Sequence, residues 1–212
     1  MTDLKDVFVS IAETNKWRDG ESVSGAGSTA GYTHTIRHEL AEFVRAFEMR
    51  SLFDAPCGDF NWMRFVEFPQ GFAYIGGEIV PALVQTNSVK YGGEGRRFVE
   101  FDIARDVFPE ADLWMCRDCL FHLSYARIFA ALEGFCRSSI GYLMTTTHLN
   151  TTGFVNRDIV DGDYRPIDLY SEPFNLPREA LYQIPDYVFP YPQREMVVWS
   201  RAQVEAALAL RR

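Results

Sequence analysis

Apolar residues recur along this chain with two different periods, and each period predicts a different element. In the segment 33–49 they recur every three or four positions, as on one face of a helix. In short segments such as 142–147 they follow one another beside β-branched residues, which favours a strand. The pattern predicts helices over 3–16, 33–49, 81–91, 124–137 and 203–210, and strands over 50–54, 72–79, 97–101, 111–116, 142–147 and 196–200.

The ends of several predicted helices carry typical signals. Pro81 falls in the first turn of the helix 81–91. Thr33 or Thr35 can cap the helix 33–49, and Ser124 can cap the helix 124–137. A further helix is expected near Trp62. Strands that alternate with helices at this pitch form βαβ units, so the pattern predicts an α/β protein with a mostly parallel sheet.

The alternation stops in the segment 149–195, which holds six of the ten prolines and predicts a long excursion before the final strand. Residues 17–32 are rich in glycine and serine and predict a loop. No linker is long enough to divide the chain, so we expect a single domain. Its expected parts are an N-terminal cap or lid (1–32), a core (33–148), a substrate-binding insertion (149–195) and a final strand and helix (196–212).

Length, composition and charge narrow the class of protein. The 212 residues are 47% hydrophobic and 24% charged, as in an ordinary globular protein. No apolar run approaches the ~20 residues of a membrane span. The N-terminus lacks the apolar core of a secretory signal, so a cytoplasmic location is expected. The net charge of −8 disfavours nucleic acid as a partner.

Four cysteines are expected to be reduced thiols, because no export signal precedes them. Cys116 and Cys119 form a CxxC pair, but zinc would need a second pair, which is absent. We interpret them as small apolar side chains at the end of a buried strand.

Acidic residues stand where the predicted strands end. Asp54, Glu78 and Asp102 stand at the ends of the first three predicted strands, and Asp118 follows the fourth. In a parallel sheet these ends share the edge at which ligands bind. Glu78 comes 24 positions after Asp54 (78 − 54), near the ~20-residue interval at which an acid meets a ribose diol. Gly58 lets the backbone of the first turn approach a ligand closely.

Four segments in this order resemble the motifs of the class I S-adenosylmethionine-dependent methyltransferases. DAPCGDFNW resembles the first motif, GGEIVPALV the second, FDI the third, and ADLWMCRDCLFHLS the fourth with the helix after it. The resemblance covers residues 33–148 and the final strand. The cofactor-binding residues that it implies are Asp54, Ala55, Pro56, Gly58, Glu78, Ile79, Asp102, Ile103 and Arg117.

The resemblance implies a Rossmann-like α/β fold, with a mostly parallel seven-stranded sheet, helices on both faces, the N-terminal helical cap and the insertion. It implies S-adenosyl-L-methionine as the cofactor and S-adenosyl-L-homocysteine as the product. The first motif departs from the family, because its turn keeps only Gly58 where two or three glycines are frequent. A pyrophosphate needs the closer Gly-x-Gly approach, whereas an adenosyl cofactor has no phosphate and its sulfonium suits neighbouring carboxylates.

Two histidines are candidates for the base that deprotonates a hydroxyl substrate. His122 lies four positions after Asp118, so on one helix the two would share a face, and Asp118 could fix the imidazole tautomer or contact the substrate. A capping or packing role for His122 is the alternative. His148, after the fifth strand, is the competing base. His34 and His38 are expected to be surface or packing residues.

Two segments are expected to build the substrate pocket. The loop 24–29 is a candidate lid or anion nest, with a plain flexible turn as the alternative. In the insertion, arginines suit a carboxylate or phosphate, and Tyr164, Tyr170 and Phe174 suit stacking on a ring. The predicted substrate-binding residues are Ser24, Ser28, Thr29, Arg157, Tyr164 and Arg165.

Three aspartates of the insertion, Asp158, Asp161 and Asp163, have oxygen ligands that a divalent cation would accept. The spacing is not that of an EF-hand. An acidic turn with local hydrogen bonds is the preferred interpretation, so no metal is predicted.

These observations predict methyl transfer from S-adenosylmethionine to a hydroxyl of a small molecule or carbohydrate, with a sugar of a surface polysaccharide as one candidate. One rival is an NAD-dependent oxidoreductase, which would need a Gly-x-Gly-x-x-Gly turn that this sequence lacks. The other rival is a non-catalytic cofactor-binding module, because a fold does not determine a function.

Overall fold

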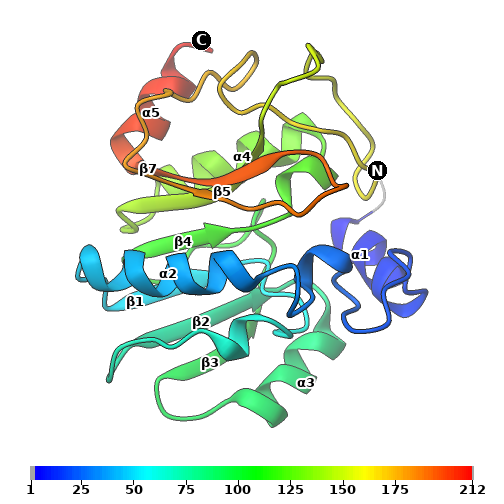
Figure 1. Cartoon of the computed structure of the whole chain (residues 1–212), viewed down its shortest axis with the longest axis vertical. Coiled ribbons are helices and arrows are strands. Elements are labelled where there is room, and N and C mark those ends of the chain that lie inside the picture. Colours follow the sequence, from blue (N-terminus) through cyan, green and yellow to red (C-terminus); the bar gives the residue numbers. More distant parts are fainter. Residues whose placement is uncertain (1–2, 212) are drawn as a thin grey trace. The chain divides into compact units, whose positions relative to one another are not determined.

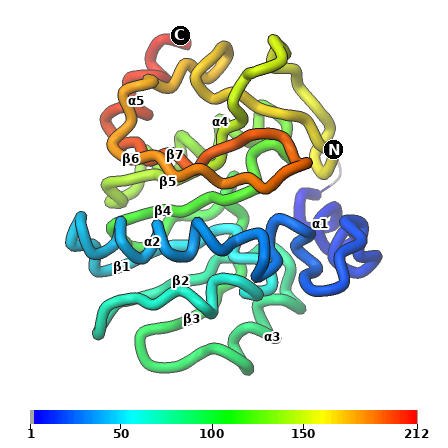
Figure 2. The backbone as a smooth tube through the Cα atoms, in the orientation of Figure 1, coloured from blue at the N-terminus to red at the C-terminus, as the bar shows by residue number. Residues whose placement is uncertain are grey.

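The structure is a computed structural model that describes residues 3–211. Residues 1 and 2, in the predicted cap (1–32), and residue 212, at the end of the predicted final part (196–212), lie outside the described part. The chain divides into two compact units: unit 1 ends at Asp102 and unit 2 begins at Ile103. Figures 1 and 2 follow the chain through them, and each unit is described separately.

The described part of unit 1 contains three strands, three α-helices and two 3₁₀ turns. Strand β2 lies between β1 and β3 and pairs in parallel with both. Helix α2 buries the apolar stripe that its period predicts, including Leu40 and Val44. The elements are α1 (Leu4–Glu13), η1 (Ala26–Ser28), α2 (His34–Ala46), β1 (Ser51–Asp54), η2 (Met63–Phe65), β2 (Ala73–Glu78), α3 (Pro81–Tyr91) and β3 (Arg96–Glu100).

The expectation of a helix near Trp62 is wrong, because only the 3₁₀ turn η2 forms there. Gly58 and Phe60 adopt φ angles of +57° and +58°, in the left-handed region that cannot enter an α-helix. Val66 then returns to extended backbone. By contrast, α3 begins at Pro81 as predicted.

Within residues 103–211, unit 2 contains four strands in the order β4-β5-β7-β6. Strand β4 pairs in parallel with β5, whereas β7 runs antiparallel to both β5 and β6. With unit 1, the described chain has seven strands and a Rossmann-like α/β fold whose pairing is mixed. The elements are β4 (Leu113–Cys116), η3 (Leu120–His122), α4 (Tyr125–Cys136), β5 (Tyr142–His148), β6 (Tyr182–Pro185), β7 (Arg194–Ser200) and α5 (Arg201–Ala209).

The apolar pattern does not predict strand β6, because it lies inside the proline-rich insertion and only Ile184 of its four residues is buried. It ends at Pro185, and an edge strand tolerates a proline that lacks an N–H. The expectation of an irregular excursion over 149–195 therefore needs this correction (Figure 2, yellow to orange). No helix in the described chain is both long enough and apolar enough to cross a membrane.

Candidate active site

The turn after β1 is held by its neighbours at Gly58. Its N–H donates to Oε2 of Glu78 over 3.0 Å, and its carbonyl accepts from Nδ2 of Asn87 over 2.8 Å. With φ at +57°, a Cβ on Gly58 would lie 2.3 Å from Oγ of Ser24. The turn thus requires glycine and is clamped from both β2 and α3, and Asn87 is a functional candidate that the sequence motifs did not indicate.

Glu78 is only 5% exposed. Its second oxygen, Oε1, accepts the N–H of Val80 over 3.0 Å. Burial raises the pKa of the Glu78 carboxyl, and the N–H groups of Val80 and Gly58 oppose that rise. Each carboxylate oxygen has two lone pairs, so the group retains acceptor capacity beyond these two bonds.

The glycines before Glu78 are required by packing. A Cβ on Gly76 would lie 2.5 Å from the ring of Phe98, and a Cβ on Gly77 would lie 2.8 Å from the ring of Phe53. The rings therefore lie directly against the backbone of β2. This explains the Gly-Gly pair that the sequence carries in front of the acid.

Asp59 connects the same turn to the N-terminal loop. Its carboxylate accepts from Oγ of Ser22 over 2.8 Å and from the N–H of Val23 over 3.0 Å. Its own N–H donates to Oγ of Ser24 over 3.2 Å. The candidate lid is thus hydrogen-bonded to the glycine turn through Ser24.

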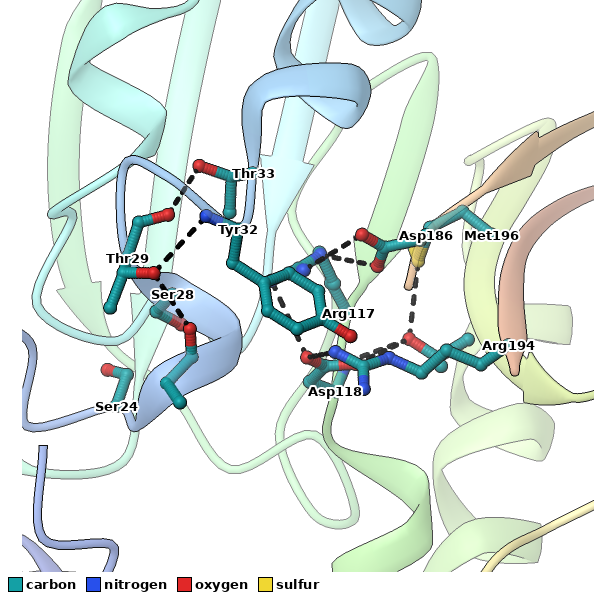
Figure 3. Close-up of polar contacts among 12 residues, drawn as sticks. Ser24, Ser28, Thr29, Tyr32, Thr33, Arg117, Asp118, Asp186, Arg194 and Met196 are labelled. Carbon is teal, nitrogen blue, oxygen red and sulfur yellow. Dashed lines mark hydrogen bonds and ion pairs between the residues drawn. The ribbon is translucent and has the colours of Figure 1, made fainter. Parts of the chain in front are cut away.

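The other predicted residues of this loop make hydrogen bonds within unit 1, and those of Thr29 are drawn in Figure 3. The hydroxyl of Thr29 donates to the carbonyl of Ala26 over 3.0 Å, and the carbonyl of the buried Ser28 accepts from Nδ2 of Asn61. Oε1 of Glu21 accepts from the same Asn61 group over 2.7 Å. The loop is therefore built into unit 1 by several hydrogen bonds.

The remaining predicted cofactor residues of unit 1 lie where β1, β2 and β3 end. Asp54 is buried and accepts the hydroxyl of Tyr74 over 2.6 Å. Burial and then the charge of Asp54 raise the pKa of Tyr74. Parallel pairing sets Asp54 opposite Gly76, so the strand ends share one edge. Ala55, Pro56, Ile79 and Asp102 follow these strand ends, whereas Ile103 and Arg117 belong to unit 2.

Asp118, in unit 2, is the second residue after β4 and adopts a left-handed φ of +51°. Its Oδ2 accepts from Nη2 of Arg194 over 2.6 Å, and its N–H donates to Oγ1 of Thr146 over 2.8 Å (Figure 3). Burial alone would raise the pKa of Asp118, but the guanidiniums of Arg117 and Arg194 outweigh it and lower the pKa. The carboxylate therefore remains ionised.

Arg117, a predicted cofactor residue, makes a buried ion pair. Its Nε and Nη2 donate to the two carboxylate oxygens of Asp186 over 2.8 and 3.0 Å, and the residue is 6% exposed. Asp186 follows β6 in the insertion, 69 positions away. The sequence alone does not indicate this partner, since no local pattern connects the two residues.

His122 does not share a helical face with Asp118, so that expectation is wrong. The left-handed backbone of Asp118 is incompatible with an α-helix, and helix α4 begins only at Tyr125. His122 lies between them, as the last residue of the 3₁₀ turn η3. Nδ1 of His122 lies 2.8 Å from the carbonyl oxygen of Asp163. A carbonyl only accepts, so Nδ1 carries the hydrogen and Nε2 is the basic nitrogen of the neutral ring.

His148 is 1% exposed and has the opposite arrangement. Its Nδ1 accepts the N–H of Ile167 over 3.2 Å, which leaves the hydrogen on Nε2, 3.4 Å from the hydroxyl of Tyr164. Burial and then the charge of Arg194 lower the pKa of His148 to about 4. The imidazole is therefore neutral near pH 7.

The insertion also completes the start of α4. Oδ1 of Asp161 accepts the N–H of Ser124 over 2.7 Å, and Oδ1 of Asp158 accepts the N–H of Tyr125 over 2.7 Å. Ser124 occupies the N-cap position, but its side chain makes no capping bond, which corrects the expected cap. No group of three or more metal-ligating side chains is found within residues 3–211.

The predicted substrate residues of the insertion differ in exposure. Arg157 is exposed and Tyr164 is 49% exposed, whereas Arg165 is buried and donates from Nη1 to the carbonyl of Leu120 over 3.0 Å. The ring of Phe174 is buried against Tyr125 and Phe129. Tyr170 donates its hydroxyl to Glu195 over 2.7 Å.

Solved structures of several S-adenosylmethionine-dependent methyltransferases have this fold. Magnesium protoporphyrin IX methyltransferase (ChlM) from Synechocystis PCC 6803 with bound SAH has a TM-score of 0.65 at 13% identity, over 93% of this chain and 98% of its own. A SAM-dependent methyltransferase of Leishmania major has a TM-score of 0.65 at 13% identity, over 93% and 86%. The DhpI–SAH complex has a TM-score of 0.57 at 14% identity, over 92% and 95%. No family model and no curated protein matches the sequence.

Proposed function

We propose that this chain, which has the fold of the class I S-adenosylmethionine-dependent methyltransferases, binds S-adenosyl-L-methionine and methylates a hydroxyl of a small-molecule or carbohydrate substrate. The observation that carries the proposal is the clamp on Gly58. Glu78 and Asn87 hold its two peptide groups at the edge where three parallel strands end. Similar structures solved with SAH bound support the choice of cofactor.

The chemistry of unit 1 fits this cofactor. The turn from Asp54 to Asn61 contains acids but no lysine or arginine, so a pyrophosphate has no cationic partner there, whereas a sulfonium has anionic ones. The lone pairs that Glu78 retains suit the two hydroxyls of a ribose. When bound, the cofactor would supply an electrophilic methyl group, and Asp54, Ala55, Pro56, Gly58, Glu78, Ile79, Asp102, Ile103 and Arg117 remain the proposed cofactor residues.

In unit 2, we assign the base to His122. The carbonyl of Asp163 holds the hydrogen on Nδ1, so Nε2 can accept the proton of a substrate hydroxyl. The ionised Asp118 favours the resulting imidazolium electrostatically. His148, the competing base, is assigned to orientation, because its Nδ1 lone pair already accepts from Ile167 and its pKa is about 4.

Substrate contacts are proposed for Ser24, Ser28 and Thr29 in unit 1 and for Arg157, Tyr164 and Arg165 in unit 2. The burial of Arg165 favours a supporting role for it over direct contact. A sugar of a surface polysaccharide stays one candidate acceptor, and no nucleic-acid partner is proposed for a chain of net charge −8.

Isothermal titration calorimetry with S-adenosylhomocysteine tests the cofactor assignment. We expect one-site binding to the natural protein and about tenfold weaker binding to Glu78→Gln, since hydrogen bonds to a charged group contribute ~1.5–3 kcal/mol. Glu94→Gln, which neutralises an exposed acid of the same unit, is the matched control and should bind normally.

The same titration with NAD separates the rival function. NAD should produce no binding heat. Binding of NAD without binding of S-adenosylhomocysteine would replace the methyltransferase by an oxidoreductase, and unchanged affinity of Glu78→Gln would remove the ribose contact from Glu78.

A further inference from the structure

Two backbone groups of the insertion hold His122 and His148 in opposite tautomers. The carbonyl of Asp163 fixes the hydrogen of His122 on Nδ1, and the N–H of Ile167 fixes the hydrogen of His148 on Nε2. His122 therefore presents an acceptor at Nε2, while His148 presents a donor. A backbone carbonyl can only accept and a backbone N–H can only donate. The fold itself therefore sets the tautomer of each histidine.

The donor of His148 sets the direction of the Tyr164 hydroxyl. Nε2 of His148 lies 3.4 Å from Oη of Tyr164, so the oxygen accepts and its own hydrogen is left to point to another acceptor. Burial raises the pKa of Tyr164, and the pKa of His148 is about 4. Around neutral pH, Tyr164 therefore keeps its hydroxyl hydrogen and His148 stays neutral, so the hydrogen bond from His148 to Tyr164 persists. Tyr164 is half exposed, as a residue that meets a ligand must be.

The acceptor, His122, and the hydroxyl donor, Tyr164, both lie against the apolar ring of Phe121. The ring centroids of His122 and Tyr164 are 6.0 Å apart, and both rings contact Phe121, at 4.6 and 5.5 Å. We propose that this pair selects a substrate with two neighbouring oxygens, such as a vicinal diol or a hydroxy-carbonyl compound. The hydroxyl to be methylated donates to His122, and the adjacent oxygen accepts from Tyr164; this inference rests on the proposed function.

The tautomers are tested without any ligand. In protein labelled with ¹⁵N-histidine, the imidazole signals of the four histidines are assigned with His122→Gln and His148→Gln. At pH 7.5 we expect the hydrogen on Nδ1 of His122 and on Nε2 of His148. A hydrogen on Nε2 of neutral His122, or a charged His148 at pH 6.5, would overturn the proposal.

Titration of the same sample with catechol and with phenol tests the oxygen pair, in the presence of saturating S-adenosylhomocysteine. Catechol should shift the His122 signals at a concentration about two- to tenfold lower than phenol, the gain from one added hydrogen bond. In Tyr164→Phe this preference should disappear while both tautomers stay unchanged. The proposal would be overturned if catechol and phenol shifted the His122 signals of the natural protein at equal concentrations. It would also be overturned if the preference for catechol survived in Tyr164→Phe.

Failure of this inference is distinguishable from failure of the proposed function. If S-adenosylhomocysteine does not bind by calorimetry, the methyltransferase assignment falls. If it binds but catechol and phenol behave alike, only the substrate class is wrong.

Discussion

At Gly58 the absence of one methyl group decides the conformation of a whole turn. We expect Gly58→Ala to lose ~1–3 kcal/mol of stability, because alanine is strained at a φ of +57° and its Cβ would lie 2.3 Å from Oγ of Ser24. Gly20→Ala is the matched control, since nothing lies within 4 Å of a Cβ there. Urea unfolding of both variants measures the effect, and equal stabilities would contradict it.

His148 should make the protein sensitive to acid. Its pKa is about 4 in the folded protein and ~6.5 in an unfolded chain. Between these values the unfolded chain binds a proton that the folded protein does not, so the free energy of unfolding rises as the pH increases from about 4 to ~6.5. At ~1.4 kcal/mol per pH unit, the free energy of unfolding is a few kcal/mol higher above this range than below it.

We expect this dependence to weaken in His148→Gln, whose amide can accept from Ile167 and donate to Tyr164 but does not titrate. Urea unfolding at pH 4.5 and pH 7 compares the two proteins. Carboxyls such as Glu78, whose raised pKa acts in the opposite sense, titrate in both proteins and cancel in the comparison. Identical slopes would show that His148 binds its proton as readily when folded.

The positions of the acids could be predicted from the sequence, whereas their partners could not. Asp54 and Glu78 end strands because the apolar pattern fixes where those strands stop. Asp118 accepts a hydrogen bond from Arg194, 76 positions away, and no local pattern indicates a contact at that distance. The tautomer of His122 likewise depends on a backbone carbonyl of Asp163, and every residue type has one.

At the scale of elements, α4 depends on a distant segment for its first turn. We expect Asp161→Ala to lose ~1 kcal/mol of stability, because the N–H of Ser124 would lose its acceptor. Ser124→Ala is the control and should be nearly neutral, since the serine side chain makes no capping bond. Thermal unfolding distinguishes the two; a larger loss in Ser124→Ala would restore the local cap that the sequence suggested.

Elements with a strong period could be predicted well, and elements shaped by the site could not. Helix α2 buries Ile36, Leu40 and Val44 on one face, and that face is visible in the sequence. Strand β6 has only four residues, of which one is buried, so its alternation is too short to stand out in the sequence. The turn before η2 follows the hydrogen bonds of Asp59 instead of helix propensity.

At the scale of the molecule, the buried pair of Arg117 and Asp186 ties the end of β4 to the end of β6 within unit 2. Arg117→Met should cost ~3–5 kcal/mol, because it leaves a buried carboxylate without its partner. The double variant, Arg117→Met with Asp186→Leu, removes both charges and should recover most of that loss. Denaturant unfolding of the single and double variants measures the coupling, and a loss below ~1 kcal/mol in Arg117→Met would show that the pair contributes little.

The hairpin of β6 and β7 places its charged residues at its base. The N–H of Asp186 donates to the carbonyl of Arg194 over 3.0 Å, and their side chains hold Arg117 and Asp118. The stretch 187–192 between them, YVFPYP, contains no charge, and Phe189 at its tip is 90% exposed. Doubling the length of a flexible loop costs only ~0.6 kcal/mol. Changes in the length or sequence of this tip should therefore cost little stability, because the charged residues that anchor the hairpin at its base stay in place.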